Sequence, residues 1–223
     1  MMVLALVSLL LAFAQVEPLV IPGERLVYEV RSARFGDMGR AEFNTATLED
    51  GTVRLSFDFS ARVLLFKVSD HTYSELDAHT LRSRRYVKRE RSPLGSRNED
   101  VSIDHASSTW TSGGETEALG SENPLDELSI IYLIRNLKLT AGVDYVLVRH
   151  FDAARNPIRL RRVDGPAEAV DIVEMIVPDT RQKNGSTRLR FHLSRDVQRV
   201  PLRIESSMPM AGQVVMSLVP ADL

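Results

Sequence analysis

The stretch Val53-Arg54-Leu55-Ser56-Phe57-Asp58-Phe59 alternates apolar and polar residues without a break. Because successive side chains of a β-strand point to opposite faces, this pattern predicts a strand with one buried and one solvated face. The alternation predicts a mainly β protein of about ten to twelve short strands. It recurs in six further runs: 26–31, 143–149, 158–161, 169–177, 189–193 and 214–219.

Turn residues separate these runs. Asn184-Gly185 is the strongest β-hairpin signal and Asp50-Gly51 is a second, because both residues of such pairs tolerate a positive φ. Short strands joined by tight turns indicate an antiparallel meander, in which one face of the sheet packs and the other meets water.

One segment, residues 123–137, departs from the period of two. Asn123 can cap a helix and Pro124 suits its first position, while Asp126 and Glu127 would follow at the positive end of the helix dipole. Apolar residues surround nearly the whole of a helix over about 124–137, which favours a buried position. We therefore expect a large curved antiparallel sheet, or an incomplete barrel, around one buried helix.

The first fourteen residues are almost wholly apolar and end in Ala12-Phe13-Ala14, a triplet typical of a signal-peptidase site. The run is too short to span a bilayer, which needs roughly 20 apolar residues. No Lys or Arg precedes it, which a start site placed too far downstream would explain; a buried N-terminal helix and an uncleaved anchor are the alternatives. We expect residues 1–14 to be a signal peptide, shortened at its start, and 15–223 to form one β-rich periplasmic domain without a transmembrane span.

The composition limits the chemistry available. The chain has no cysteine, which excludes disulfides and thiolate metal sites. A net charge of −2 argues against a general polyanion binder. The five histidines are dispersed, and the motifs of zinc proteases, α/β-hydrolases and nucleotide-binding enzymes are missing from the sequence. We therefore predict no metal, no cofactor and no nucleic-acid partner.

Residues 82–97 are strongly basic, with seven Lys or Arg against one acid, Glu90. Basic residues fall on both faces of a strand there, which is typical of an edge strand that charge protects from aggregation. The alternative is a surface for anionic lipid head groups, lipopolysaccharide or polyanionic glycans. The residues assigned to that surface are Arg84, Arg85, Lys88 and Arg89.

The predicted helix indicates a place for a ligand. In lipid-carrying half-barrels of the cell envelope, such a helix plugs the concave face and shares an apolar cavity with acyl chains. A helix that only completes the core is the alternative. The predicted cavity wall consists of Leu64, Leu65, Phe66, Leu128, Ile131 and Tyr132.

Three stretches resemble an uncharacterised family of bacterial exported proteins, the domain of unknown function 3108. Residues 21–28 are similar to its PGE-x-L-x-Y opening, 126–135 to its D-x-L-S-x-x-Y-x-x-R segment, and 194–204 to its S-x-D-x-x-R-x-P-x-x-I strand entry. Arg195 departs from the pattern, which usually has Asp there. The resemblance implies an envelope β-rich domain and brings no established activity. By fold analogy the chain is also similar to the open β-barrels of periplasmic lipoprotein carriers.

The charged residues of these stretches predict an ion pair that locks the helix to the sheet, either Arg135 with Asp196 or Arg199 with Asp126. We expect a non-enzymatic envelope protein that binds an amphipathic ligand, such as a lipid or an acyl chain, in the concave face of the sheet. One alternative is a structural or scaffolding protein that pairs with an envelope partner through a strand edge. The other is a hydrolase acting on cell-wall or glycan material.

Overall fold

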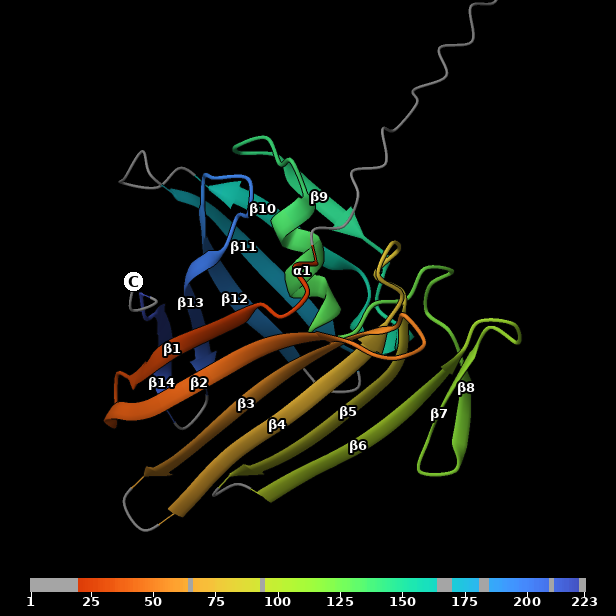
Figure 1. Ribbon diagram of the computed structural model, residues 1–223, viewed down its shortest axis with the longest axis horizontal. Helices are drawn as coiled ribbons and strands as arrows, with labels where there is room; N and C mark the ends of the chain where they lie inside the picture. Colours follow the sequence, from red (N-terminus) through yellow and green to blue (C-terminus); the bar gives the residue numbers. More distant parts are fainter. Residues whose placement is uncertain are drawn as a thin grey trace, which may run out of the picture.

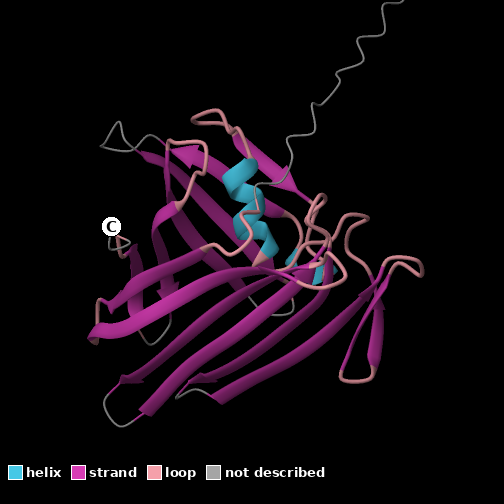
Figure 2. Cartoon of the chain, viewed as in Figure 1, coloured by secondary structure: helices cyan, strands magenta, loops and turns pink. Residues whose placement is uncertain are grey.

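The computed structural model describes residues 20–63, 66–92, 95–163, 170–180, 185–208 and 211–220. Fourteen β-strands and one α-helix make up most of this part of the chain (Figure 1; Figure 2). The strands are β1 (Arg25–Ser32), β2 (Gly36–Thr47), β3 (Val53–Val63), β4 (Phe66–Leu76), β5 (Ser83–Ser92), β6 (Gly95–Asp104), β7 (Thr109–Ser112), β8 (Glu115–Ala118), β9 (Asp144–Leu147), β10 (Ile158–Val163), β11 (Val170–Asp179), β12 (Gly185–Ser194), β13 (Pro201–Met208) and β14 (Gly212–Leu218). The helix is α1 (Ser129–Asn136), and a 3₁₀ turn, η1 (Ala153–Arg155), follows β9.

All fourteen strands belong to one antiparallel sheet. From β1 to β8 and from β9 to β14 each strand pairs with the next in the chain, and the pairing of β1 with β14 joins the two series. β8 and β9 are the two outer strands and, within the described residues, do not pair with each other. The predicted fold, a large curved antiparallel sheet or incomplete barrel around one helix, is confirmed.

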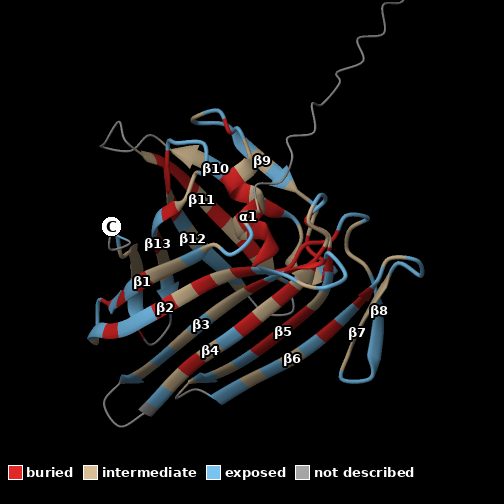
Figure 3. Ribbon diagram, viewed as in Figure 1, coloured by how far each residue is buried: buried red, intermediate tan, exposed pale blue. Residues whose placement is uncertain are grey.

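The alternation at the start of β3 decides which face of the sheet packs. Val53 and Leu55 are buried, and the register sets them beside other inward-facing residues of β2 and β4. Helix α1 lies against this concave face, and buried residues concentrate around it (Figure 3). The main core therefore joins α1 to inward-facing side chains from both series of strands.

Helix α1 is shorter than the predicted span of 124–137. Leu125 is extended rather than helical: its N–H donates to the Arg149 carbonyl (2.6 Å) and its carbonyl accepts from the Phe151 N–H (3.0 Å). Because these long-range bonds hold Leu125 in an extended conformation, the helix begins only at Ser129. Asn123 and Pro124 therefore do not begin it, and that part of the prediction is wrong.

The predicted turns and termini have different outcomes. Gly51 adopts a φ of +80° in the tight connection of β2 to β3, which confirms the Asp50-Gly51 hairpin. β12 begins at Gly185 and pairs with β11, whereas Asn184 lies outside the described residues, as do residues 1–14. A single domain over 15–223 stays a prediction. Among the described residues, no helix combines the length and apolar character needed to cross a membrane.

The prediction that the basic stretch forms an edge strand is wrong. β5 is an inner strand, paired with β4 on one side and β6 on the other. Two of its charges are compensated by acids on those neighbours: Lys88 pairs with Asp70 of β4 (2.9 Å), and Arg85 makes a bidentate pair with Asp100 of β6 (3.0 and 2.9 Å). Cross-strand pairing with carboxylates thus lets a basic sequence occupy the interior of a sheet.

Candidate functional site

A cleft of about 480 Å³ lies between the β6–β8 end of the sheet and the segment that follows β9. We call it the seam cleft, because its walls come from both series of strands: β5–β8 from one, and residues 150–155 with Asp179 from the other. Its lining residues are Tyr86, Arg97, Glu99, Val101, Trp110, Ser112, Glu115, Glu117, Glu127, His150, Phe151, Asp152, Arg155 and Asp179.

Backbone contacts fix the segment that closes the cleft. The Gly120 N–H donates to the Phe151 carbonyl (2.7 Å), and Asn156 accepts from the Arg149 and His150 N–H groups (3.1 and 3.0 Å). A Cβ on Gly120 would lie 2.7 Å from the Ala153 nitrogen, so only glycine fits at this crossing. The walls of the cleft are thus held by a main-chain bond and by the side-chain amide of Asn156, whose Oδ1 is the acceptor.

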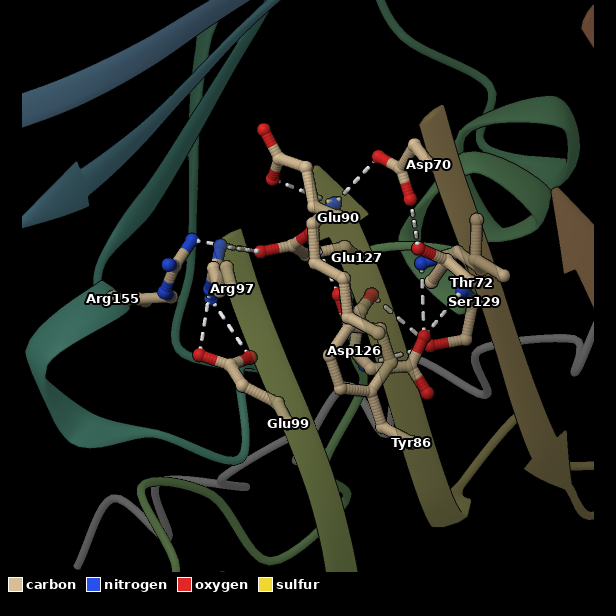
Figure 4. A network of polar contacts seen from close by, with 12 residues as sticks. Asp70, Thr72, Tyr86, Glu90, Arg97, Glu99, Asp126, Glu127, Ser129 and Arg155 are labelled. Carbon is tan, nitrogen blue, oxygen red and sulfur yellow. Dashed lines mark hydrogen bonds and ion pairs between the residues drawn. The ribbon is translucent and has the colours of Figure 1, made fainter. Parts of the chain in front are cut away.

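The floor of the cleft is a network of charges around Glu127 (Figure 4). The Glu127 carboxylate lies 3.0 Å from Arg155 and 3.5 Å from both Lys88 and Arg97. It also accepts a hydrogen bond from the Tyr86 hydroxyl (2.8 Å). One carboxylate is therefore shared by three cations and a phenol.

Two of these cations have further acidic partners. Lys88 also pairs with Asp70 (2.9 Å) and approaches Glu90 (3.8 Å), and Arg97 binds both oxygens of Glu99 (2.6 and 2.8 Å). The network therefore extends across the inner face of β4, β5 and β6.

These contacts hold the network in its charged form. Burial alone would raise the pKa of Glu127, but its three cationic neighbours and the Tyr86 hydroxyl lower that pKa well below its usual range. Burial alone would lower the pKa of Lys88, and the surrounding carboxylates, Glu127 first, raise it instead. Near neutral pH both groups are ionised, so neither serves as a proton donor or acceptor there.

The preceding residue, Asp126, has the opposite environment. Its buried carboxylate accepts from the Leu128 and Ser129 N–H groups (both 2.9 Å) and from the hydroxyls of Ser74 and Ser83. Burial raises the pKa of Asp126, although these hydrogen bonds oppose the rise. Asp126 thus caps the first turn of α1 and ties it to β4 and β5.

Aromatic rings form the other wall of the seam cleft. The rings of Trp110 and Phe151 meet edge to face at 5.4 Å, and His150 stacks on Phe151 at 4.6 Å. Burial, followed by the charge of Arg155, lowers the pKa of His150 to about 4, so the ring is neutral. Its Nδ1 accepts from the Asp152 N–H (3.0 Å), which leaves the proton on Nε2.

Two donors beside the cleft have no hydrogen-bond acceptor. Both His150 Nε2 and Trp110 Nε1 are buried, and neither has a partner in the described part of the structure. Buried polar groups without partners are rare, since each costs about 1–3 kcal/mol. Because neither nitrogen is exposed, an acceptor reaches them only if the side chains that cover them move.

The lining of the cleft is acidic overall. It contains two arginines, Arg97 and Arg155, against six carboxylates. Among the described residues, no group of three or more His, Asp or Glu side chains is placed to hold a metal ion. The seam cleft thus offers aromatic surface, carboxylate groups of which Glu99 and Glu127 are paired with cations, and buried N–H donors. The six carboxylates are Glu99, Glu115, Glu117, Glu127, Asp152 and Asp179.

Comparison with known proteins gives a family. Residues 27–219 match the family described as "Protein of unknown function (DUF3108)". The chain belongs to this family. No curated protein matches its sequence.

The fold of this DUF3108 member also occurs among solved structures. A crystal structure described as a beta-barrel-like protein of domain of unknown function DUF1849 from Brucella abortus superposes with a TM-score of 0.55. The two sequences are 12% identical, and the match covers 87% of this chain and 94% of that one. At that identity the likeness shows the fold alone.

The predicted helix–sheet ion pairs of this DUF3108 protein are not the ones that form. Arg135 binds both oxygens of Glu24 (2.7 and 2.8 Å) instead of Asp196. Arg199 binds Asp171 (2.7 Å) rather than Asp126, whose buried site is filled by hydroxyls and backbone N–H groups. Both predicted pairings are therefore wrong.

The three stretches that carry the family resemblance nevertheless meet in space. Arg135, from the second stretch, binds Glu24 of the first and donates to the Gln198 carbonyl of the third (3.2 and 3.1 Å). The Tyr28 hydroxyl donates to the Pro201 carbonyl (2.7 Å). Asp196 accepts from the Gln198 and Arg199 N–H groups and shapes the turn before β13. These residues hold α1 to the sheet.

The space between α1 and the sheet is filled. Leu128 and Tyr132 are buried and Ile131 is half-buried, and the cavity that Ile131 and Tyr132 help to line measures about 10 Å³. That is room for a single water and not for an acyl chain. Leu64 and Leu65, also predicted as cavity wall, lie outside the described residues, as does the side chain of Phe66.

The four predicted head-group residues all lie on β5, but they do not form one surface. Lys88 turns inward and is buried in the Glu127 network, so it is not available to a ligand on the surface. Arg85 is engaged with Asp100, and Arg84 lies 3.1 Å from the Thr52 hydroxyl. Arg89 is exposed on the outer face.

Sequence reasoning missed the residues that make the seam cleft. Glu127 was assigned to the helix dipole, and Trp110 and His150 belong to segments without a recognisable motif. Their proximity depends on the bridge between Leu125 and His150 and on the position of β7 next to the outer strand β8. The only available signal was the presence of the single tryptophan in a polar stretch.

Proposed function

We propose that this protein is a non-enzymatic ligand-binding protein of the cell envelope whose ligand occupies the seam cleft. The ligand is amphipathic and carries a cationic group. The observation that supports this is the combination, in one cleft of about 480 Å³, of aromatic rings, six carboxylates and two buried N–H donors without acceptors. A cleft that joins apolar surface to a few directed polar groups is typical of a small-molecule site.

Each feature selects part of the ligand. Exposed carboxylates on the rim, such as that of Glu115, attract a cation, and the face of Trp110 suits either an apolar chain or the cation itself. The donors His150 Nε2 and Trp110 Nε1 are covered in this structure, and they call for an oxygen acceptor, such as an ether, hydroxyl or carbonyl, once the covering side chains move aside. The proposed ligand therefore carries a positive charge, whereas the sequence predicted an anionic head group.

The charged states of the cleft residues favour binding over catalysis. Glu127 is held ionised by its three cationic neighbours, and His150 is neutral and almost inaccessible. A general acid or base works best with a pKa near the operating pH and with access to the substrate. Glu127 lacks the first property and His150 lacks both.

Two parts of the proposal come from the sequence: the location in the cell envelope and the amphipathic character of the ligand. The apolar segment that ends in Ala12-Phe13-Ala14 supports export. Because the space beneath α1 has room for one water at most, we place the apolar part of the ligand against Trp110 and Phe151 instead.

Intrinsic fluorescence tests the proposal directly, because Trp110 is the only tryptophan of the chain. Titration with octyltrimethylammonium, octyl glucoside and octyl sulfate, all below their critical micelle concentrations, compares three head groups on one tail. We expect the cationic amphiphile to shift the Trp110 emission at the lowest concentration and the anionic one to bind weakest.

A pair of variants locates the binding. Replacing the exposed β8 acids in Glu115→Gln/Glu117→Gln should weaken binding of octyltrimethylammonium at least about fivefold, on the order of 1 kcal/mol. The matched control Glu29→Gln/Glu49→Gln removes the same charge from exposed positions away from the cleft. Tighter binding of the sulfate, or equal effects of the two double variants, would contradict the proposal.

Scaffolding through a strand edge is a second candidate, favoured by the outer strand β9. Val143, Val146 and Val148 are three of the six large hydrophobic side chains found exposed in the described residues. An outer strand with exposed apolar side chains can pair with another strand. We expect the protein to self-associate in sedimentation velocity runs and Val146→Lys to abolish this; a monomer at all concentrations would remove the candidate.

A further inference from the structure

A second groove, of about 530 Å³, lies over β4, β5 and β6. On β5, Lys88 turns inward to the Glu127 network, so its neighbour Arg89 and the alternate residue Arg91 turn outward. The register places His71 and Asn98 on either side of Arg89, and Ser69 and Ser96 on either side of Arg91. Two guanidinium groups thus lie centrally on the outer face, between rows of polar side chains.

The two central arginines are at most partly compensated: the charge of Arg89 helps to lower the pKa of the Asp100 carboxylate without forming an ion pair with it. Arg89 and Arg91 are exposed, and neither has an ion pair among the described residues. The nearest outward acids are engaged elsewhere: Asp58 binds His71 Nδ1 (2.9 Å), and Asp100 is held by Arg85. The outer side of β5 therefore differs from its inner side, where Lys88 has three carboxylate partners.

Two further cations extend this surface. Arg62 of β3 lies directly opposite Lys67 of β4, and both are exposed on the outer face. Like charges directly opposite each other destabilise a sheet, so an anion bound between them would stabilise the arrangement. We call Arg62, Lys67, Arg89 and Arg91 the basic face. It lies where β3–β6 project away from α1 (Figure 1).

We propose that the basic face docks this protein on a bilayer surface rich in anionic phospholipids. The four cations are spread over three adjacent strands, each about 4.8 Å from the next, rather than gathered around one point. A dispersed, open set of cations matches many separate phosphates on a flat surface better than one soluble phosphate. In this orientation the outer face of β3, β4 and β5, rather than the seam cleft, faces the membrane.

Co-sedimentation with vesicles tests the proposal. The full-length protein should pellet with vesicles of phosphatidylcholine mixed with phosphatidylglycerol and not with vesicles of phosphatidylcholine alone. Arg89→Gln/Arg91→Gln should weaken binding about 25-fold, since each cation near an anionic bilayer contributes about fivefold. Arg62→Gln/Lys67→Gln should weaken it similarly, and both pairs are exposed, so the fold should persist.

Matched controls separate this surface from general charge and from the seam cleft. Arg159→Gln/Arg188→Gln removes two exposed charges from β10 and β12 and should bind as the unaltered protein does. The seam-cleft variant Glu115→Gln/Glu117→Gln should also bind vesicles normally, so the two proposals fail independently. Equal binding to both vesicle types, equal loss in the control, or displacement by low concentrations of glycerol phosphate would overturn the proposal.

Discussion

Arg135 and Glu127 anchor opposite ends of the same segment, in two contrasting ways. Arg135 is almost inaccessible, and one carboxylate, Glu24, neutralises it in the apolar part of the core. Glu127 lies in the polar part of the inner face and is shared by three cations, of which Lys88 and Arg97 have other acids. The first site has a single counter-ion, although Arg135 also donates to the Gln198 carbonyl, whereas the second site has several charged partners. The cost of breaking each should differ accordingly.

The largest effect is expected at Arg135. Arg135→Ala leaves the Glu24 carboxylate buried without its cation, which costs about 3–5 kcal/mol of unfolding free energy. Denaturation by urea measures it. The double variant Glu24→Gln/Arg135→Met removes both charges and should recover a large part of the loss. A loss below about 1 kcal/mol in Arg135→Ala would show that water hydrates the Glu24 carboxylate in the variant. The proposed difference between the Arg135 site and the Glu127 network would then be refuted.

Glu127→Gln should cost less, about 1–3 kcal/mol. Lys88 retains Asp70 and Glu90, Arg97 retains Glu99, and the amide oxygen can still accept from Tyr86. Urea denaturation under the same conditions allows direct comparison. A loss as large as that of Arg135→Ala would mean that the redundancy does not stabilise the protein.

The pH dependence of unfolding distinguishes the adjacent carboxylates Asp126 and Glu127. The folded pKa of Glu127 is lowered, so its stabilising contribution is present above its unfolded pKa, roughly 4.3, and is lost as pH falls through the folded pKa. Glu127→Gln should therefore flatten the fall of stability below about pH 5. The folded pKa of Asp126 is raised, so its contribution has the opposite sign and Asp126→Asn should steepen that fall. Urea midpoints between about pH 2 and 7 test both. The same change of slope in both variants would refute the assignment.

The smallest effect is expected on β8, at the rim of the seam cleft. All four residues of β8 are exposed, so Glu115→Gln/Glu117→Gln should change the unfolding free energy by no more than about 0.5 kcal/mol. The thermal midpoint, measured without ligand, checks this. A larger change would mean that the acids support the fold, and their use as a binding test would lose its meaning.

The outcome of each prediction from the sequence depended on the distance of the contacts involved. The alternation at Val53 to Phe59 and the apolar segment around Ile130 are local, and they predicted the sheet and its buried helix correctly. The start of the helix was wrong because Leu125 bonds to backbone groups of residues 149 and 151. The partner of Arg135 was wrong because Glu24 lies 111 residues away in the chain.

The sequence by itself determined the mainly β architecture, the place of the helix and the basic character of residues 82–97, because periodicity and charge are properties of neighbouring residues. Only the tertiary structure decided which side of β5 each charge faces and that Trp110, Glu127 and His150 share one cleft. Those features depend on register and on closure between distant segments. No local pattern encodes them, since a shift of one residue exchanges the two faces of a strand.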